Sequence, residues 1–180
     1  EFLEVFDKYT QDSMAKMSQA TEADVEQAIV SSLTGFAELK SWSAGKRSLY
    51  LQKLWHALDN RSAEIVDIII KEAGKPRSYA ISEVNRCLAT IENAVTEAKR
   101  FVGETVPIDF DAGEGKTAFT KRIPIGPILC ITPFNFPLNL VLHKVAPALA
   151  SGCSVIVKPA PQTPLSSIFL ANLIHEVGYP

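Results

Sequence analysis

The chain has 180 residues, of which 47% are hydrophobic and 21% are charged, and its formal net charge is −2. This composition is typical of a soluble globular protein and gives no reason to expect binding to nucleic acid or to an anionic membrane. No apolar run approaches the roughly 18–20 residues that cross a bilayer, and the N-terminus lacks the basic start and apolar core of a signal peptide.

The cysteines favour a reducing compartment. Cys87, Cys130 and Cys153 are odd in number and widely spaced, with no C-x-x-C pair. That pattern predicts free thiols in a cytoplasmic protein rather than a disulfide framework. Cys130 and Cys153 lie in apolar runs, where a cysteine is usually a small buried hydrophobe.

The first hundred residues are predicted to be mainly helical. A short strand is expected at 3–9, and Thr21 with Asp24 has the spacing of a helix start. A later helix stops at Gly74, where glycine supplies a left-handed cap and Pro76 prevents continuation. The apolar positions of the three helices expected here are Val25, Ile29, Leu33, Phe36 and Ala37, then Leu51, Leu54, Trp55 and Leu58, then Ile65, Val66, Ile68, Ile69 and Ile70.

The clearest helical periodicity runs from Ile81 to Val102. Its apolar residues are Ile81, Val84, Leu88, Ile91, Val95, Ala98 and Val102. Alternating spacings of three and four could indicate a coiled coil, but the pattern stops at Gly103. A long helix packed on a domain is the favoured interpretation.

From residue 104 the period changes to two, which predicts a β-hairpin over 104–123 with a turn at 111–115. Its faces are only half apolar, and two strands alone are marginally stable. Such a hairpin needs a partner, either a further part of a longer chain or another subunit.

The last third of the chain has the order β-α-β-α. Buried strands are expected at 128–131 and 154–157, the helix between them should open near Pro137 and end at Gly152, and Pro147 should kink or shorten it. A last helix should open at Thr163 and Pro164. This order predicts an α/β protein with parallel strands joined by right-handed crossovers. Because parallel sheets are normally covered on both faces, two strands suggest an N-terminal fragment of a longer protein.

Two polar residues follow the predicted strands, where open α/β sheets bind ligands. Asn135 either caps the next helix or donates its amide to a developing oxyanion, and from the residues alone both interpretations stay open. Lys158 could hold a ribose or a phosphate, or be a solvated lysine at a strand end. Lys144 could face the crevice or solvent. Three scattered histidines predict no metal site.

The stretch from 122 to 180 resembles the NAD(P)-dependent aldehyde dehydrogenase superfamily. The resemblance rests on motifs that occur in the family's order, and two shorter segments, 72–76 and 103–107, also resemble the family's sequence. These motifs are Ile125-Gly126-Pro127, Ile131-Thr132-Pro133-Phe134-Asn135-Phe136-Pro137-Leu138, Lys144 to Gly152, Val157-Lys158-Pro159-Ala160 and Gln162-Thr163-Pro164.

The resemblance implies a Rossmann-like fold and a set of roles. In that family a cysteine thiolate attacks an aldehyde, a hydride passes to NAD or NADP, and the thioester left behind is hydrolysed to the acid. By resemblance, Asn135 is the oxyanion-hole amide, and Lys158 holds the adenosine ribose or its 2′-phosphate. Lys144 matches a lysine sometimes assigned to proton relay. Thr132, Pro133 and Phe134 line the cofactor cleft.

The resemblance also divides the chain. Residues 1–103 are the helical outer part of the cofactor-binding domain, and 124–180 are the first half of its NAD(P)-binding sheet. The hairpin at 104–123 is an arm that joins a neighbouring subunit's sheet, which implies a homo-oligomer, a dimer or a tetramer.

One departure concerns the cofactor. Many NAD-preferring members carry glutamate three residues after the lysine, and this chain has Pro161 there. Glutamate accepts from the ribose 2′-hydroxyl and repels a 2′-phosphate, whereas proline does neither. Tolerance of NADP is therefore expected.

The family's nucleophilic cysteine and general-base glutamate come beyond the equivalent of Pro180. None of the three cysteines matches the nucleophile, so the 180 residues alone are expected to be inactive. Two alternatives remain: a non-catalytic nucleotide-binding or oligomerisation module, and a superfamily relative acting on acyl phosphates or acyl-CoA.

Overall fold

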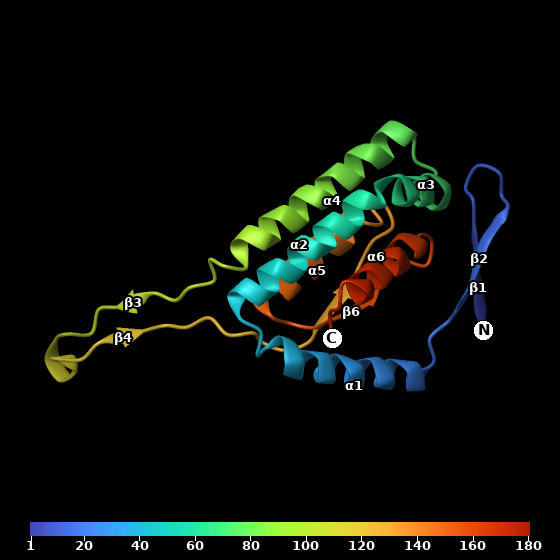
Figure 1. Cartoon of the computed structure of the whole chain (residues 1–180). Coiled ribbons are helices and arrows are strands. Elements are labelled where there is room, and N and C mark those ends of the chain that lie inside the picture. Colours follow the sequence, from blue (N-terminus) through green and yellow to red (C-terminus); the bar gives the residue numbers. More distant parts are fainter.

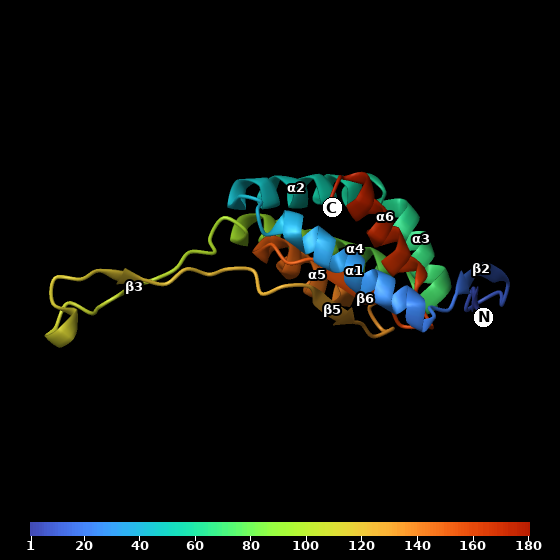
Figure 2. The same cartoon turned by 90° about the horizontal axis from the view of Figure 1, so that it is seen from below.

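A computed structural model describes all residues 1–180. A helical body carries two projections, one at each end (Figures 1 and 2). The elements in chain order are β1 (Phe2–Phe6), β2 (Ser13–Ser18), α1 (Glu22–Leu39), α2 (Ala44–Asn60), α3 (Ser62–Ala73), α4 (Arg77–Glu97), β3 (Thr105–Val106), a 3-10 turn η1 (Asp111–Gly113), β4 (Ala118–Phe119), β5 (Ile128–Ile131), α5 (Asn139–Ser151), β6 (Val155–Lys158) and α6 (Leu165–Glu176).

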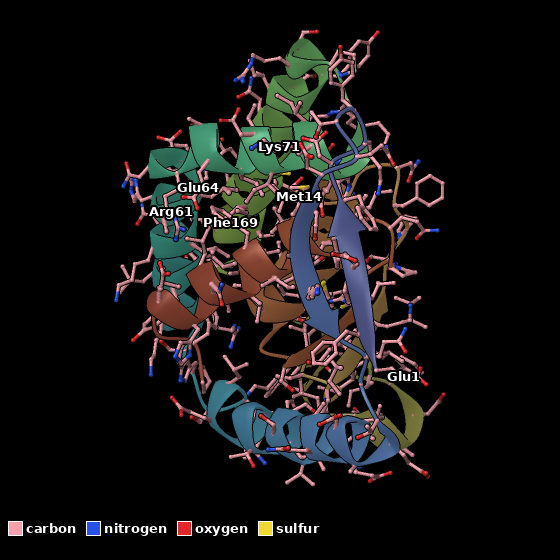
Figure 3. All side chains as sticks on the ribbon, turned by 90° about the vertical axis from the view of Figure 1, so that its right-hand side faces the viewer. Glu1, Met14, Arg61, Glu64, Lys71 and Phe169 are labelled. Atoms are coloured by element: carbon pink, nitrogen blue, oxygen red, sulfur yellow. The ribbon has the colours of Figure 1, made fainter.

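The N-terminal projection is a hairpin rather than the single strand expected at 3–9. β1 pairs antiparallel with β2, which the sequence did not indicate because the three apolar residues of Ser13–Ser18 do not alternate with polar ones. In the connecting turn, Asp7 accepts hydrogen bonds from the amides of Tyr9 and Thr10. The amide of Lys8 donates to the carbonyl of Lys71 at 2.8 Å and ties the hairpin to the end of α3. Figure 3 shows the hairpin from this side, with Lys71 behind it.

Helix α1 begins as predicted but buries a different face. The Thr21 hydroxyl accepts from the amide of Asp24, whose carboxylate accepts in return from the amide of Thr21. The buried residues are Ser32, Gly35 and Leu39, while Val25, Ile29 and Leu33 are exposed. A β-carbon on Gly35 would lie 3.3 Å from the carbonyl oxygen of Pro180, so the small residues allow α1 to approach the body closely. The apolar face of α1 is therefore not the face through which the helix packs on the body.

The core of the body lies between α2, α3, α4, α5 and α6. Leu51, Leu54, Ile69 and Ile91 are fully buried in it. α4 packs on α2, α3 and α5, which confirms a long helix on a domain rather than a coiled coil. Figure 3 shows Arg61, at the junction of α2 and α3, beside Glu64 and Phe169 of α6. Its guanidinium carbon lies 4.6 Å from the Phe169 ring centre.

The hairpin at 104–123 projects far from the body (Figure 1). β3 and β4 pair antiparallel through two residue pairs, Thr105 with Phe119 and Val106 with Ala118. The predicted hairpin is confirmed, although most of its length is extended chain without a ladder. We call residues 104–123 the arm.

β5 and β6 form the predicted parallel pair, in register from Ile128 with Val155 to Ile131 with Lys158. β6 lies one residue later than expected, so Lys158 is its last residue. The expectation of buried strands is wrong for β5, where Leu129 and Ile131 are each 61% exposed, and holds only in part for β6, whose apolar residues are half-buried. α5 covers the face that holds Cys130, and alternate residues of β5 point to the uncovered face.

α5 ends as predicted but differs at its start, whereas α6 begins directly after Thr163 and Pro164, as predicted. Gly152 caps α5 with φ 85°. Pro147 neither ends nor shortens α5, which continues to Ser151. Pro137 lies in the turn before α5 rather than in its first helical turn. No helix is long and apolar enough to span a bilayer.

Candidate functional site at the carboxyl edge of the parallel strands

The carboxyl ends of β5 and β6 bring two loops together. Both the amide and the hydroxyl of Thr132 donate to the carbonyl of Lys158, at 3.2 and 3.4 Å. Further along the same two loops, the hydroxyl of Thr163 donates to the carbonyl of Phe134 at 3.5 Å. The loop after β5, residues 132–138, therefore lies beside the loop after β6, residues 159–164.

The side chains expected to bind ligands line this edge in different ways. Thr132 is buried and holds the loops together, whereas Pro133, Phe134 and Asn135 are exposed. Lys158 is also exposed, and its ammonium donates at 3.3 Å to the carbonyl of Pro159. Because this hydrogen bond uses only one of its three N–H donors, the ammonium can still donate to a hydroxyl or pair with an anion.

Asn135 does not cap a helix. α5 begins four residues later, at Asn139, and no side chain from its own N-cap position bonds its first turn. The capping interpretation of Asn135 is wrong, and its amide remains exposed on the loop with no bond inside the chain.

A buried glutamate on α4 takes the capping role instead. One oxygen of Glu83 accepts from the amides of Leu138 and Asn139, both at 3.1 Å. Its other oxygen accepts from the ammonium of Lys75 at 2.5 Å, and the Glu83 side chain is 0% exposed. A carboxylate fits this place because the first amides of a helix are unpaired and its N-terminus carries partial positive charge.

A second buried glutamate does the same for α6. Glu72, the last residue but one of α3, accepts from the amides of Leu165 and Ser166 at 2.8 and 3.0 Å, and from the Ser166 hydroxyl. Burial raises the pKa of Glu72, against the opposing effect of these hydrogen bonds. Both helices that follow the strands are thus anchored by carboxylates from the outer helices.

Sequence reasoning missed both glutamates, although each stands in an apolar helical pattern. Glu83 lies three residues after buried Ala80 and four before buried Cys87, and Glu72 lies three after buried Ile69. A carboxylate on the buried face of a helix requires a hydrogen-bonding or charged partner. An acidic residue among the apolar positions of a predicted helix was therefore the signal that could have identified both glutamates.

Lys144 lies in a cavity separate from the edge formed by the ends of β5 and β6. It lines a cavity of about 330 Å³ with Pro124, Ile128, Pro147 and Ser151, beside the amino-terminal half of β5. The structure therefore brings Thr132 to Asn135 together with Lys158, and sets Lys144 apart from them.

The cysteines are structural. Burial raises the pKa of the Cys87 thiol well above its ordinary range, and nearby Glu83 adds to the rise. Burial likewise raises the pKa of Cys130. These two thiols are protonated at neutral pH, unlike an activated nucleophile. No group of three His, Cys, Asp or Glu side chains is placed to bind a metal ion.

Comparisons with known proteins agree with this architecture. The model of the aldehyde dehydrogenase family matches residues 1–180. A 3-sulfolactaldehyde dehydrogenase of Priestia aryabhattai is 41% identical over 100% of this chain and 38% of its own length.

Solved structures give the same result. Aldehyde dehydrogenase 21 of Physcomitrella patens, in complex with the reaction product succinate, matches with a TM-score of 0.95 and 40% identity over 100% of this chain and 38% of that one. A glyceraldehyde-3-phosphate dehydrogenase of Methanocaldococcus jannaschii, complexed with NADP, matches with a TM-score of 0.91 and 31% identity over 97% of this chain and 37% of that one. The chain thus spans somewhat more than a third of the length of its relatives, and it belongs to the aldehyde dehydrogenase family.

Proposed function

We propose that these 180 residues form the N-terminal part of a longer NAD(P)-dependent aldehyde dehydrogenase. They contribute half of the cofactor site and one donor to the oxyanion hole. The observation that carries the proposal is the pairing of the two loops at the carboxyl edge of β5 and β6, which sets Asn135 and Lys158 on one edge. In the proposed division, residues 1–103 and 124–180 belong to the cofactor-binding domain, and the arm joins a second subunit.

The residues at this edge fit a dinucleotide. The exposed ammonium of Lys158 can donate to ribose hydroxyls or pair with a 2′-phosphate, and Pro133 and Phe134 offer apolar surface beside it. The dinucleotide supplies the acceptor for the hydride that leaves the substrate. Pro161, exposed in the loop after β6, brings no carboxylate that would repel a 2′-phosphate, so the enzyme accepts NADP as well as NAD.

Asn135 acts on the substrate rather than on the cofactor. Its side-chain amide donates to the aldehyde oxygen as that oxygen gains negative charge. A donor that is already fixed in place stabilises the transition state more than the ground state. The nucleophile comes from the remainder of the enzyme, because Cys87, Cys130 and Cys153 are all buried.

The substrate proposed is a small aldehyde that carries an anionic group. Among the relatives, one acts by its name on 3-sulfolactaldehyde and another on succinate semialdehyde. The test is the formation of reduced nicotinamide by the full-length protein with a panel of sulfonated, carboxylated and uncharged aldehydes.

The proposal expects cofactor reduction with at least one anionic aldehyde, and none from residues 1–180 alone. Reduction only when coenzyme A or phosphate is added would indicate an acyl-transferring relative. Absence of reduction with every aldehyde, together with retained NAD(P) binding, would indicate a non-catalytic nucleotide-binding module.

A further inference from the structure

The loop that carries Asn135 is held from one side by α4 and the turn before it. Glu83 receives the amides of Leu138 and Asn139, three and four residues after Asn135. Cys87, one helical turn after Glu83, lies with its sulfur 3.9 Å from the Asn139 side-chain oxygen. These contacts join segments more than fifty positions apart in the sequence.

The residue immediately after Asn135 is also held from α4. The ammonium of Lys75 lies 3.9 Å from the centre of the Phe136 ring, and the guanidinium of Arg86 lies 5.0 Å from it. The Lys75 ammonium is the same group that pairs with Glu83. One lysine therefore connects the buried carboxylate that fixes the helix start to the aromatic ring next to Asn135.

On its other side, Asn135 follows Phe134, whose carbonyl accepts from Thr163. Asn135 is thus an exposed amide between two restrained neighbours. A hydrogen-bond donor that must meet a developing charge gains most when its position is fixed before the reaction.

We propose that Glu83, together with Lys75, is a positioning pair for the Asn135 amide. The pair fixes the backbone on the carboxyl side of Asn135 and so aims the donor at the substrate oxygen. This inference rests on the proposed function, because it requires Asn135 to act in catalysis. Glu83 is fully buried, and Lys75 is engaged with Glu83 and with the Phe136 ring, so their effect passes through the loop.

Glu72 provides a matched control. It is as buried as Glu83 and also accepts from the first amides of a helix. Glu72 caps α6, however, whereas Glu83 caps α5, which directly follows the loop that carries Asn135. A general loss of stability from removing a buried capping carboxylate would affect Glu72→Gln and Glu83→Gln alike.

The experiment is a double-mutant cycle in the full-length enzyme. Glu83→Gln is expected to lower kcat about tenfold, with the KM for cofactor within about twofold of wild type. Glu72→Gln should leave kcat within about twofold. In an Asn135→Ala background, Glu83→Gln should lower kcat by less than about twofold, because the group that it positions is gone.

Lys75→Met tests the same pair if Glu83→Gln folds poorly, since it removes the ion pair but leaves the cap. It should lower kcat in the presence of Asn135 and not in its absence, and Lys75→Arg should restore part of the loss. Amide hydrogen exchange at Leu138 and Asn139 should accelerate in Glu83→Gln and not in Glu72→Gln, which gives a measure independent of turnover.

Three results would overturn the inference. An equal loss of kcat from Glu83→Gln with and without Asn135 would show that Glu83 acts elsewhere. An equal loss from Glu72→Gln would show a general effect on stability. Unchanged kcat in Glu83→Gln, with Asn135→Ala strongly impaired, would refute the positioning role but keep the proposed function, whereas unchanged kcat in Asn135→Ala would refute both.

Discussion

Gly103 stands where the arm leaves the body, and Gly103→Ala should open the arm at its base. A β-carbon at this position would lie 1.6 Å from the carbonyl oxygen of Thr120, which is backbone and cannot rotate away. Two hydrogen bonds close the base: the Thr120 amide donates to the Glu104 carbonyl at 2.8 Å, and the Glu104 amide donates to the Thr120 hydroxyl at 2.9 Å. At about 0.5–1.5 kcal/mol each, their loss amounts to about 1–3 kcal/mol of local stability.

Amide hydrogen exchange measures this effect directly. Because 1.4 kcal/mol is about tenfold in an equilibrium constant, protection of the Thr120 amide should fall about 5- to 150-fold. The melting temperature of the body should stay unchanged, because the arm contributes no residue to the main core. Gly45→Ala, with Ser43 Oγ as its nearest neighbour at 3.9 Å, should leave exchange in the arm unaltered. Unchanged protection of Thr120 in Gly103→Ala would refute this account of the arm base.

Three further predictions concern titration, thiol chemistry and the cofactor. Burial raises the pKa of Glu72 above its ordinary 4.5, so its contribution to stability is full below that pH and is lost as pH rises through the folded-state value. The free energy of unfolding should therefore decline as pH rises above 4.5, and chemical denaturation of Glu72→Gln should show a flatter profile; an identical profile would contradict this reasoning. Cys87, Cys130 and Cys153 are all buried, so a thiol reagent at neutral pH should label the native chain far more slowly than the denatured chain, and fast native labelling would argue against the packing described. Pro161→Glu should shift the kcat/KM ratio of the full-length enzyme from NADP toward NAD, and an unchanged ratio would remove Pro161 from cofactor choice.

Local signals in the sequence were enough to place most elements. Thr21 with Asp24 forms the predicted cap, and Gly74 and Gly152 adopt the left-handed conformation that ends α3 and α5. These features depend on residues within a few positions of one another, which is why they can be predicted without tertiary information. The β-α-β order likewise implied a parallel pair, and β5 and β6 form one.

Features that depend on distant partners were not predictable in this way. The apolar residues of α1 share one face, yet the helix packs through Ser32, where the Ser154 hydroxyl donates to the Ser32 carbonyl at 2.7 Å. The strand β2 shows no apolar alternation in its sequence. It is held by backbone pairing with β1. Periodicity shows that a helix has two faces, but packing decides which one is buried.

In the candidate site, too, local features could be predicted from the sequence and contacts between distant residues could not. Apolar strand patterns placed Asn135 and Lys158 at strand ends, and the structure sets the loop that carries Asn135 beside the end of β6, whose last residue is Lys158. The carboxylates that anchor the starts of α5 and α6 could not be paired with these helices from the sequence, because Glu83 lies 55 positions from Leu138 and Glu72 lies 94 from Ser166.

Turnover by the full-length enzyme carrying Asn135→Ala tests the central claim most directly. Asn135→Asp is the matched variant, because it keeps the size of the side chain but cannot donate when ionised. Both variants should lower kcat about 10²- to 10³-fold, the effect typical of removing one oxyanion donor, while cofactor affinity stays near that of wild type. Wild-type kcat in either variant would contradict the assignment of Asn135 to the oxyanion hole.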